Sequence, residues 1–289
     1  MDKKTVLAFI IIAVVLILTP YYLKLISPPQ EPKSISPTTD TLKTFMNREA
    51  IITPEEFAEK KTIPGEKLPF SAYPKEDILE YTIDTELYTA RISSRGGGSI
   101  INWTLKKFKG PYEEPLRFIE SDENPNMNVI FITMENDTIN TGYYNFYVDP
   151  SLRGTVVLGP DKPKQTINFK LSLNSDKYIE KELTFYNDSY SIDLKISLIN
   201  LDEVIANREY NLSWMTPLSA TEKDVNEDMN YTKAYVLVGD EIEDVDAKSN
   251  KTKVKAFVGT THWTAVRTKY FLSAIIPVNK KGNGSILKG

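Results

Sequence analysis

The feature that most constrains the fold is a two-residue hydrophobic period that runs through the chain from Lys75 onward. Residues 167–173, 179–185 and 192–198 each alternate apolar and polar side chains. Alternation at this period places one face of a strand in a core and the other in water. Turn-forming residues separate the three segments. The pattern therefore predicts a three-stranded antiparallel meander.

Other segments carry similar strand patterns, and no comparably strong amphipathic helix interrupts them. They lie near 78–84, 87–93, 99–105, 128–134, 143–148, 153–158, 209–215, 233–239, 252–258 and 262–276. The number of predicted strands is larger than one open twisted sheet accommodates. We therefore expect two packed antiparallel sheets. The absence of a repeat of fixed period argues against a propeller. The predicted fold class is mainly β, with one large antiparallel β-sandwich over residues 75–289.

The N-terminus carries the only long apolar run of the sequence. Val6 to Leu18 is entirely apolar, and the uncharged stretch continues to Leu23. A helix of that length would be roughly 27 Å long, close to the thickness of a bilayer core. A cleaved signal peptide and a buried soluble helix are the alternatives, but bulky residues follow Leu18 where a signal peptidase requires small ones. The sequence favours a transmembrane anchor over residues 5–26.

Two lysines, Lys3 and Lys4, precede this run. The positive-inside rule then places residues 1–4 in the cytoplasm and everything after about Ile26 outside it. Residues 27–74 hold eight of the seventeen prolines, a composition that is typical of a spacer. Within it, 53–56 has helix-start chemistry, to which we assign no role.

Composition excludes several function classes. The formal net charge is −4, from 35 Lys and Arg against 39 Asp and Glu, and there is no basic block, so nucleic-acid binding is not expected. Cysteine is absent and His262 is the only histidine. Disulfides, thiol nucleophiles, cysteine-based zinc sites and sites that need two imidazoles are therefore excluded.

The remaining candidates for chemistry are weak. His262 would need an orienting carboxylate to act as a base, and a lone strand histidine is more often a packed or surface residue. The acidic stretches 222–228 and 240–246 lack the ligand order of a calcium loop and read as solvated loops between strands. The glycine-rich segment 95–99 precedes a strand instead of a helix, so it reads as a tight β-turn. The sixteen tyrosines are best explained by core and edge packing. We predict no catalytic, cofactor-binding or metal site.

Four segments in order resemble a known family. They are MDKKTVLAFI at the start, YTARISSRGGGSIINWTLKKF (88–108), LSWMTPLSATEKDVNEDM (212–229) and HWTAVRTKYFLSAIIP (262–277). The first motif within them is the glycine turn Gly96 to Gly98 followed by Leu105 to Phe108. The second comprises Trp263, Ala265, Tyr270, Phe271, Ile276 and Pro277. Together they resemble the N-terminal half of the YidC family of bacterial membrane protein insertases.

The resemblance implies an inner-membrane protein with one span here and a large periplasmic domain. That domain would be a β-supersandwich similar to galactose mutarotases. The implied activity is insertion and folding of nascent inner-membrane proteins, alone or with the Sec translocon, without enzymatic chemistry or a cofactor. The implied partners are the lipid bilayer, those client proteins and Sec components. The residues implied in this role here are those of the anchor, Val6 to Leu23.

The sequence departs from the family at its C-terminus. After Pro277 it reads VNKKGNGSILKG, whereas the family continues into a five-helix core with an intramembrane arginine, which matches no residue here. A truncated product without insertase activity of its own and with an unpaired sheet edge is the expectation. The alternatives are a membrane-tethered carbohydrate-binding or mutarotase-like domain, and an envelope tether without a binding site.

Overall fold

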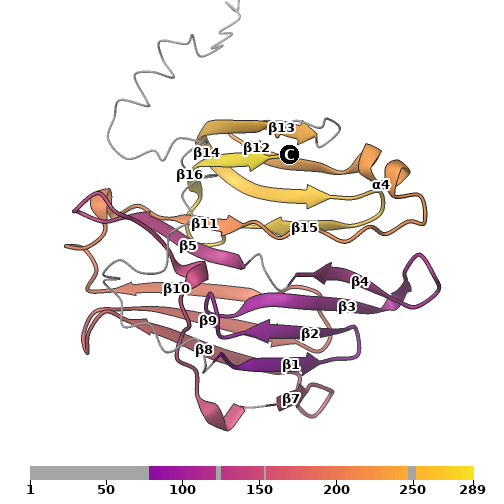
Figure 1. Cartoon of the computed structure of the whole chain (residues 1–289), viewed down its shortest axis with the longest axis horizontal. Coiled ribbons are helices and arrows are strands. Elements are labelled where there is room, and N and C mark those ends of the chain that lie inside the picture. The colour runs from indigo at the N-terminus through magenta and orange to yellow at the C-terminus, as the bar shows by residue number, and fades with distance from the viewer. Residues whose placement is uncertain (1–77, 122–124, 153, 247–251) are drawn as a thin grey trace, which may run out of the picture. The chain divides into compact units, whose positions relative to one another are not determined.

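The computed structural model describes residues 78–121, 125–152, 154–246 and 252–289, and these are mostly β-strands (Figure 1). The mainly β fold class predicted from the two-residue period is confirmed. The predicted cytoplasmic segment 1–4, anchor 5–26 and linker 27–74 lie outside the described residues. Among the described residues, no helix is long and apolar enough to cross a membrane.

The first sheet has five strands in the order β4-β3-β2-β1-β7. All neighbours in it are antiparallel except β1 and β7, which run parallel. Its inward positions are apolar, as the alternation in β1 and β2 requires. The strands are β1 (Glu80–Asp84), β2 (Tyr88–Ser93), β3 (Ser99–Lys109), β4 (Pro115–Glu120) and β7 (Gly154–Val157).

The predicted meander forms a second, three-stranded antiparallel sheet in the order β10-β9-β8. It comprises β8 (Lys164–Ser172), β9 (Tyr178–Tyr186) and β10 (Asp193–Ile199). In β9 buried and half-buried positions alternate along the whole strand. The sequence therefore specified this register, because a slip by one residue would move the apolar set into water.

A third sheet, in the order β11-β5-β6, contributes to the same core as the first two. It contains β5 (Asn126–Ile132), β6 (Thr138–Asn140) and β11 (Asn211–Trp214). One cluster of buried side chains takes members from all three sheets, among them Tyr81, Phe131 and Phe169. This shared core is that of a β-sandwich.

The C-terminal sheet has a separate, smaller core, which departs from the expectation of one sandwich throughout. Its order is β13-β12-β14-β15, and β16 also pairs with β14. Four buried residues, Ala234, Val236, Val245 and Leu287, form its cluster. The strands are β12 (Lys233–Val238), β13 (Glu241–Asp246), β14 (Val254–Arg267), β15 (Leu272–Ile275) and β16 (Gly282–Lys288).

Several local predictions were wrong. The acidic stretch 240–246 is not a solvated loop but contains strand β13, whose acidic residues sit at an edge where charge is tolerated. The stretch 222–228 leads into helix α4 (Val225–Tyr231), because the Asp224 side chain accepts hydrogen bonds from the first backbone N–H groups.

Residues 143–148 form no strand. They follow a short 3₁₀ helix, Thr141–Tyr143, and make only isolated bridges, such as Arg95 with Asn145. The break predicted between 252–258 and 262–276 is absent, because β14 runs through from Val254 to Arg267. The pattern at 262–276 is instead divided between β14 and β15. Strands β4, β6 and β16 were not predicted; β6 is only three residues long.

Candidate functional site

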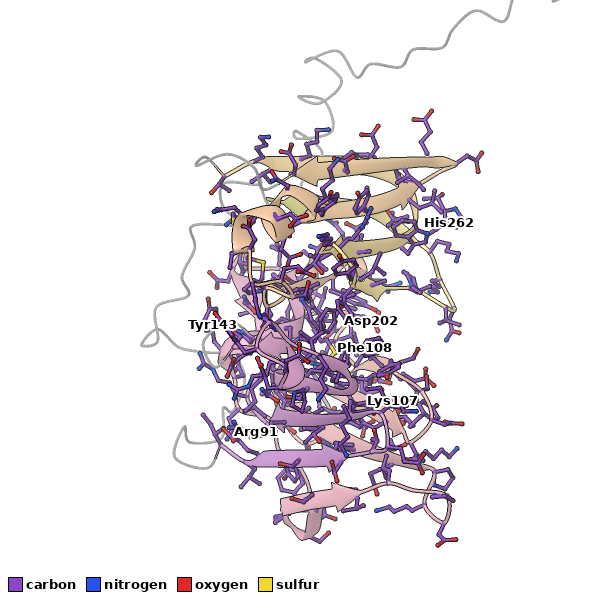
Figure 2. All side chains as sticks on the ribbon, turned by 90° about the vertical axis from the view of Figure 1, so that its right-hand side faces the viewer. Arg91, Lys107, Phe108, Tyr143, Asp202 and His262 are labelled. Atoms are coloured by element: carbon purple, nitrogen blue, oxygen red, sulfur yellow. The ribbon has the colours of Figure 1, made fainter. Side chains whose placement is uncertain are left out.

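His262 lies on β14 at an irregular point of the sheet. The pairing with β12 shifts register beside it, between Leu237 and Val238, and its side chain is half-buried. In Figure 2 it lies apart from Asp202 and Phe108. Within the described residues no carboxylate is hydrogen-bonded to it, and no group of three His, Cys, Asp or Glu side chains is placed to hold a metal ion. His262 therefore has no carboxylate partner in the described part of the chain.

Within the acidic stretch 222–228, Asp228 is buried and stabilises the fold. Its carboxylate accepts hydrogen bonds from the backbone N–H of Thr221 at 2.6 Å and from that of Lys269 at 3.0 Å. The Lys269 side chain also pairs with Glu227 at 2.8 Å, a hydrogen bond that raises the pKa of the lysine. Asp228 therefore links helix α4 to the turn between β14 and β15.

The glycine-rich segment is a buried tight turn between β2 and β3. Gly97 has φ of +68° and Gly98 has φ of +92°, in the left-handed region that favours glycine. A Cβ atom on Gly97 would lie 2.8 Å from the ring of Phe146. The prediction of a tight β-turn is confirmed, and the turn packs against the core instead of facing a ligand.

A buried lysine holds this turn in place. Lys181 on β9 is fully buried, and its ammonium group donates hydrogen bonds to the carbonyl oxygens of Gly96 at 2.7 Å and Met127 at 2.9 Å. Met127 has a positive φ of 54° on β5. Burial lowers the pKa of Lys181 to about 7, because the charged form loses its hydration. Lys181 thus links the turn, β5 and β9.

Lys181 and Asp228 are residues that sequence reasoning did not single out. A signal for Lys181 existed, because it shares its strand face with Ile179, Leu183 and Phe185 in an otherwise apolar row. Asp228 had no such signal, since its acidic neighbours indicated solvent.

The two motifs of the sequence resemblance meet in an aromatic cluster. Phe108 comes from the end of β3 and Phe271 from the turn before β15, and their rings stack edge to face with centroids 5.3 Å apart. Tyr190 lies 6.2 Å from Phe108 on one side, and Phe118 lies 5.7 Å from Phe271 on the other. Phe108 and Tyr190 are each 41% exposed. We call Phe108, Tyr190, Phe271 and Phe118 the aromatic ridge.

The other residues of the second motif lie nearby on the C-terminal sheet. Trp263 and Ala265 are on β14, Tyr270 precedes Phe271 in the turn, and Ile276 and Pro277 directly follow β15. Ala265 is buried, whereas Tyr270 and Ile276 are mostly exposed. The anchor residues Val6 to Leu23 lie outside the described part of the chain.

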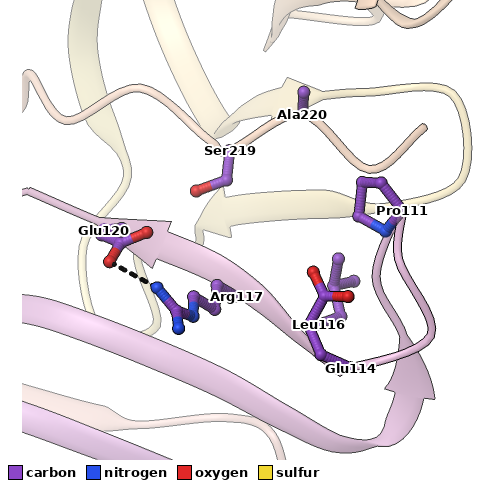
Figure 3. Close-up of a pocket in the computed structure, with 7 residues that line it drawn as sticks. All are labelled: Pro111, Glu114, Leu116, Arg117, Glu120, Ser219 and Ala220. Carbon is purple, nitrogen blue, oxygen red and sulfur yellow. Dashed lines mark hydrogen bonds and ion pairs between the residues drawn. The ribbon is translucent and has the colours of Figure 1, made fainter. Parts of the chain in front are cut away.

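A shallow cavity of about 370 Å³ lies along β4 (Figure 3). Its charged side chains partly neutralise each other, because Arg117 and Glu120 form an ion pair at 3.1 Å. It is lined by Pro111, Glu114, Leu116, Arg117, Glu120, Ser219 and Ala220. None of these is aromatic, so the cavity has no platform for stacking a sugar ring.

Comparison with known proteins agrees with the resemblance. A family model described as the YidC periplasmic domain matches residues 80–286. The chain is 27% identical to a membrane protein insertase YidC of Chlorobaculum parvum, over all of this chain and 48% of the relative. It is 26% identical to that of Chlorobium limicola, over all of this chain and 48% of the relative.

The insertase YidC of Prosthecochloris aestuarii is 27% identical over 96% of this chain and 46% of the relative. The chain thus spans about half the length of the curated relatives it matches. The family model, in contrast, covers most of the chain and nearly all of its described strands. The chain belongs to the YidC periplasmic domain family.

Proposed function

We propose that the chain is the anchor and periplasmic domain of a membrane protein insertase. It assists the insertion and folding of integral inner-membrane proteins, alone or beside the Sec translocon. The match to the YidC periplasmic domain and the names of the relatives support this. In this proposal the insertion step itself belongs to the half of the relatives that the chain does not match.

The proposed arrangement follows the sequence. Residues 1–4 lie in the cytoplasm, residues 5–26 anchor the chain, residues 27–74 form the linker, and residues 75–289 lie in the periplasm. The chain acts by contact and not as an enzyme, and it uses no cofactor. The carbohydrate-binding alternative gains no support from the cavity along β4, which lacks an aromatic lining.

The aromatic ridge is the observation that best supports this proposed role. Exposed apolar rings gathered at one place mark interaction sites more often than scattered ones do. Phe108 and Tyr190 present such rings from two segments that are far apart in the sequence. A membrane protein that has not finished inserting exposes apolar segments, and these are the chemical match for such a surface. We therefore assign client contact to the ridge.

Site-specific photo-cross-linking tests this role. A photoreactive phenylalanine analogue replaces Tyr190 in the full chain, and another replaces Val157 on β7 as the control. Val157 is 63% exposed, more than Tyr190, so surface access alone would favour the control. Membrane vesicles that contain each variant are presented with ribosome-bound nascent membrane proteins. We expect cross-links from position 190 only. Equal yields from both positions would refute client contact at the ridge.

A further inference from the structure

The edge of the C-terminal sheet carries apolar side chains that are mostly exposed in the described structure. β15 is the end strand of this sheet (Figure 1). Phe271, just before it, packs against the main core, but Leu272 is 55% exposed. In the segment after β15, Ile276 is 63% exposed and Val278 is 87% exposed. We call Leu272, Ile276 and Val278 the outward row.

Three cations lie next to the outward row, one by strand register and two by sequence. Arg267 pairs with Leu272 across β14 and β15, and directly opposed residues share a sheet face. Lys280 and Lys281 follow Val278 closely. Among residues 78–121, 125–152, 154–246 and 252–289, no carboxylate lies within 4.0 Å of these three cations. Lys233, in contrast, pairs with Asp244 on the same sheet at 3.0 Å.

An added peptide strand fits this edge poorly. β15 has only four residues, and Pro277, which has no N–H group to donate, follows almost at once. Val278, the most exposed residue of the outward row, lies beyond the strand, where an added strand would not cover it.

A second copy of the chain also fits poorly. Pairing of two copies through their β15 edges would gather the Arg267, Lys280 and Lys281 of both copies at one interface. Like charges placed opposite each other in a sheet are destabilising. Charge complementarity instead requires an anionic partner with an apolar interior.

We propose that the outward row, with Arg267, Lys280 and Lys281, docks on the surface of a bilayer that contains anionic lipids. Ile276 and Val278 enter the boundary between headgroups and acyl chains, and the three cations contact lipid phosphates. Docking is shallow, because the unpaired backbone of a sheet edge cannot leave water without cost. The inference takes one element from the proposed function, namely that the domain lies beside a bilayer.

Depth measurements with a fluorescent probe test the docking directly. The full chain has no cysteine, so Val278→Cys provides a single site for an environment-sensitive dye. The labelled chain is studied with single-copy nanodiscs of phosphatidylcholine, with or without phosphatidylglycerol. We expect a blue-shifted emission, and quenching by lipids with a nitroxide on the acyl chain, in the anionic discs only. High salt should reverse both effects. Val157→Cys, on β7, is the exposed control site and should show neither.

A matched pair of charge variants completes the test. Lys280→Gln with Lys281→Gln should weaken docking roughly thirtyfold, at about 1 kcal/mol for each lysine. Lys162→Gln with Lys164→Gln removes the same charge from another surface and should leave docking unchanged.

Three results would overturn the proposal. They are no shift in either lipid, a shift without lipid quenching, and equal quenching in both lipids. Because no client protein is present, these results are independent of the cross-linking test of client contact.

Discussion

The buried Lys181 makes the stability of the domain depend on pH in a way that one substitution should abolish. In the unfolded chain its pKa is the ordinary 10.5, and burial lowers it to about 7 in the fold. Between these two values the unfolded state binds more protons than the folded state. The free energy of unfolding therefore rises as the pH rises from 7 towards 10.5, and the gain is lost as the pH falls from 10.5 back to 7.

The magnitude follows from the difference of about 3.5 between the two pKa values. Each pH unit contributes about 1.4 kcal/mol, so the full rise is roughly 5 kcal/mol, of which roughly half falls between pH 7 and pH 9. Lys181→Met keeps an unbranched side chain but has no titrating group. It also leaves the carbonyls of Gly96 and Met127 without their donor, so the absolute stability changes as well.

The assay is urea unfolding of the full chain in detergent, followed by tryptophan fluorescence at several pH values. The slope of the unfolding free energy against pH is the decisive quantity. Lys195→Met is the matched control on β10, because Lys195 pairs with Glu182 and this hydrogen bond raises its pKa. We expect a rising slope in the parent and the control, and a flatter slope in Lys181→Met. Equal slopes in all three proteins would refute the reasoning.

Two further predictions concern the turn and helix α4. Gly97→Ala should lower the free energy of unfolding by roughly 2–4 kcal/mol, because of its positive φ and the clash with Phe146. Gly239→Ala, whose φ is also positive but whose Cβ would meet nothing within 4 Å, should cost only about 1 kcal/mol. A similar loss of unfolding free energy in both variants would contradict the close contact between position 97 and Phe146. Asp228→Ala should cost roughly 2–4 kcal/mol in the same assay and speed hydrogen exchange at the Lys269 amide. An unchanged exchange rate at the Lys269 amide would contradict the link between Asp228 and this turn.

The strands were predictable where alternation is clear, and less so where pairing partners decide. β8, β9 and β10 were found because each has one apolar face. β13 was missed because Glu241, Glu243, Asp244 and Asp246 leave it little apolar pattern. Its strand state comes from its register with β12, which a single sequence does not reveal.

The candidate site was predictable in its parts but not in its assembly. The motif around Phe108 and the motif around Phe271 could each be read from the sequence. Their contact at 5.3 Å depends on how the first sheet and the C-terminal sheet come together, which is a tertiary property. The position of Lys181 in an apolar row pointed to burial, but its two carbonyl partners come from segments 54 and 85 residues away.

The central claim is that this domain contacts membrane proteins while they are being inserted. The most direct measurement is the ratio of photo-cross-linking yields at positions 190 and 157 of the full chain, taken for a nascent membrane protein and for a nascent soluble protein of the same length. Client contact at the aromatic ridge predicts a high ratio for the membrane protein and a ratio near one for the soluble protein. A ratio near one for both, or the same high ratio for both, would contradict it.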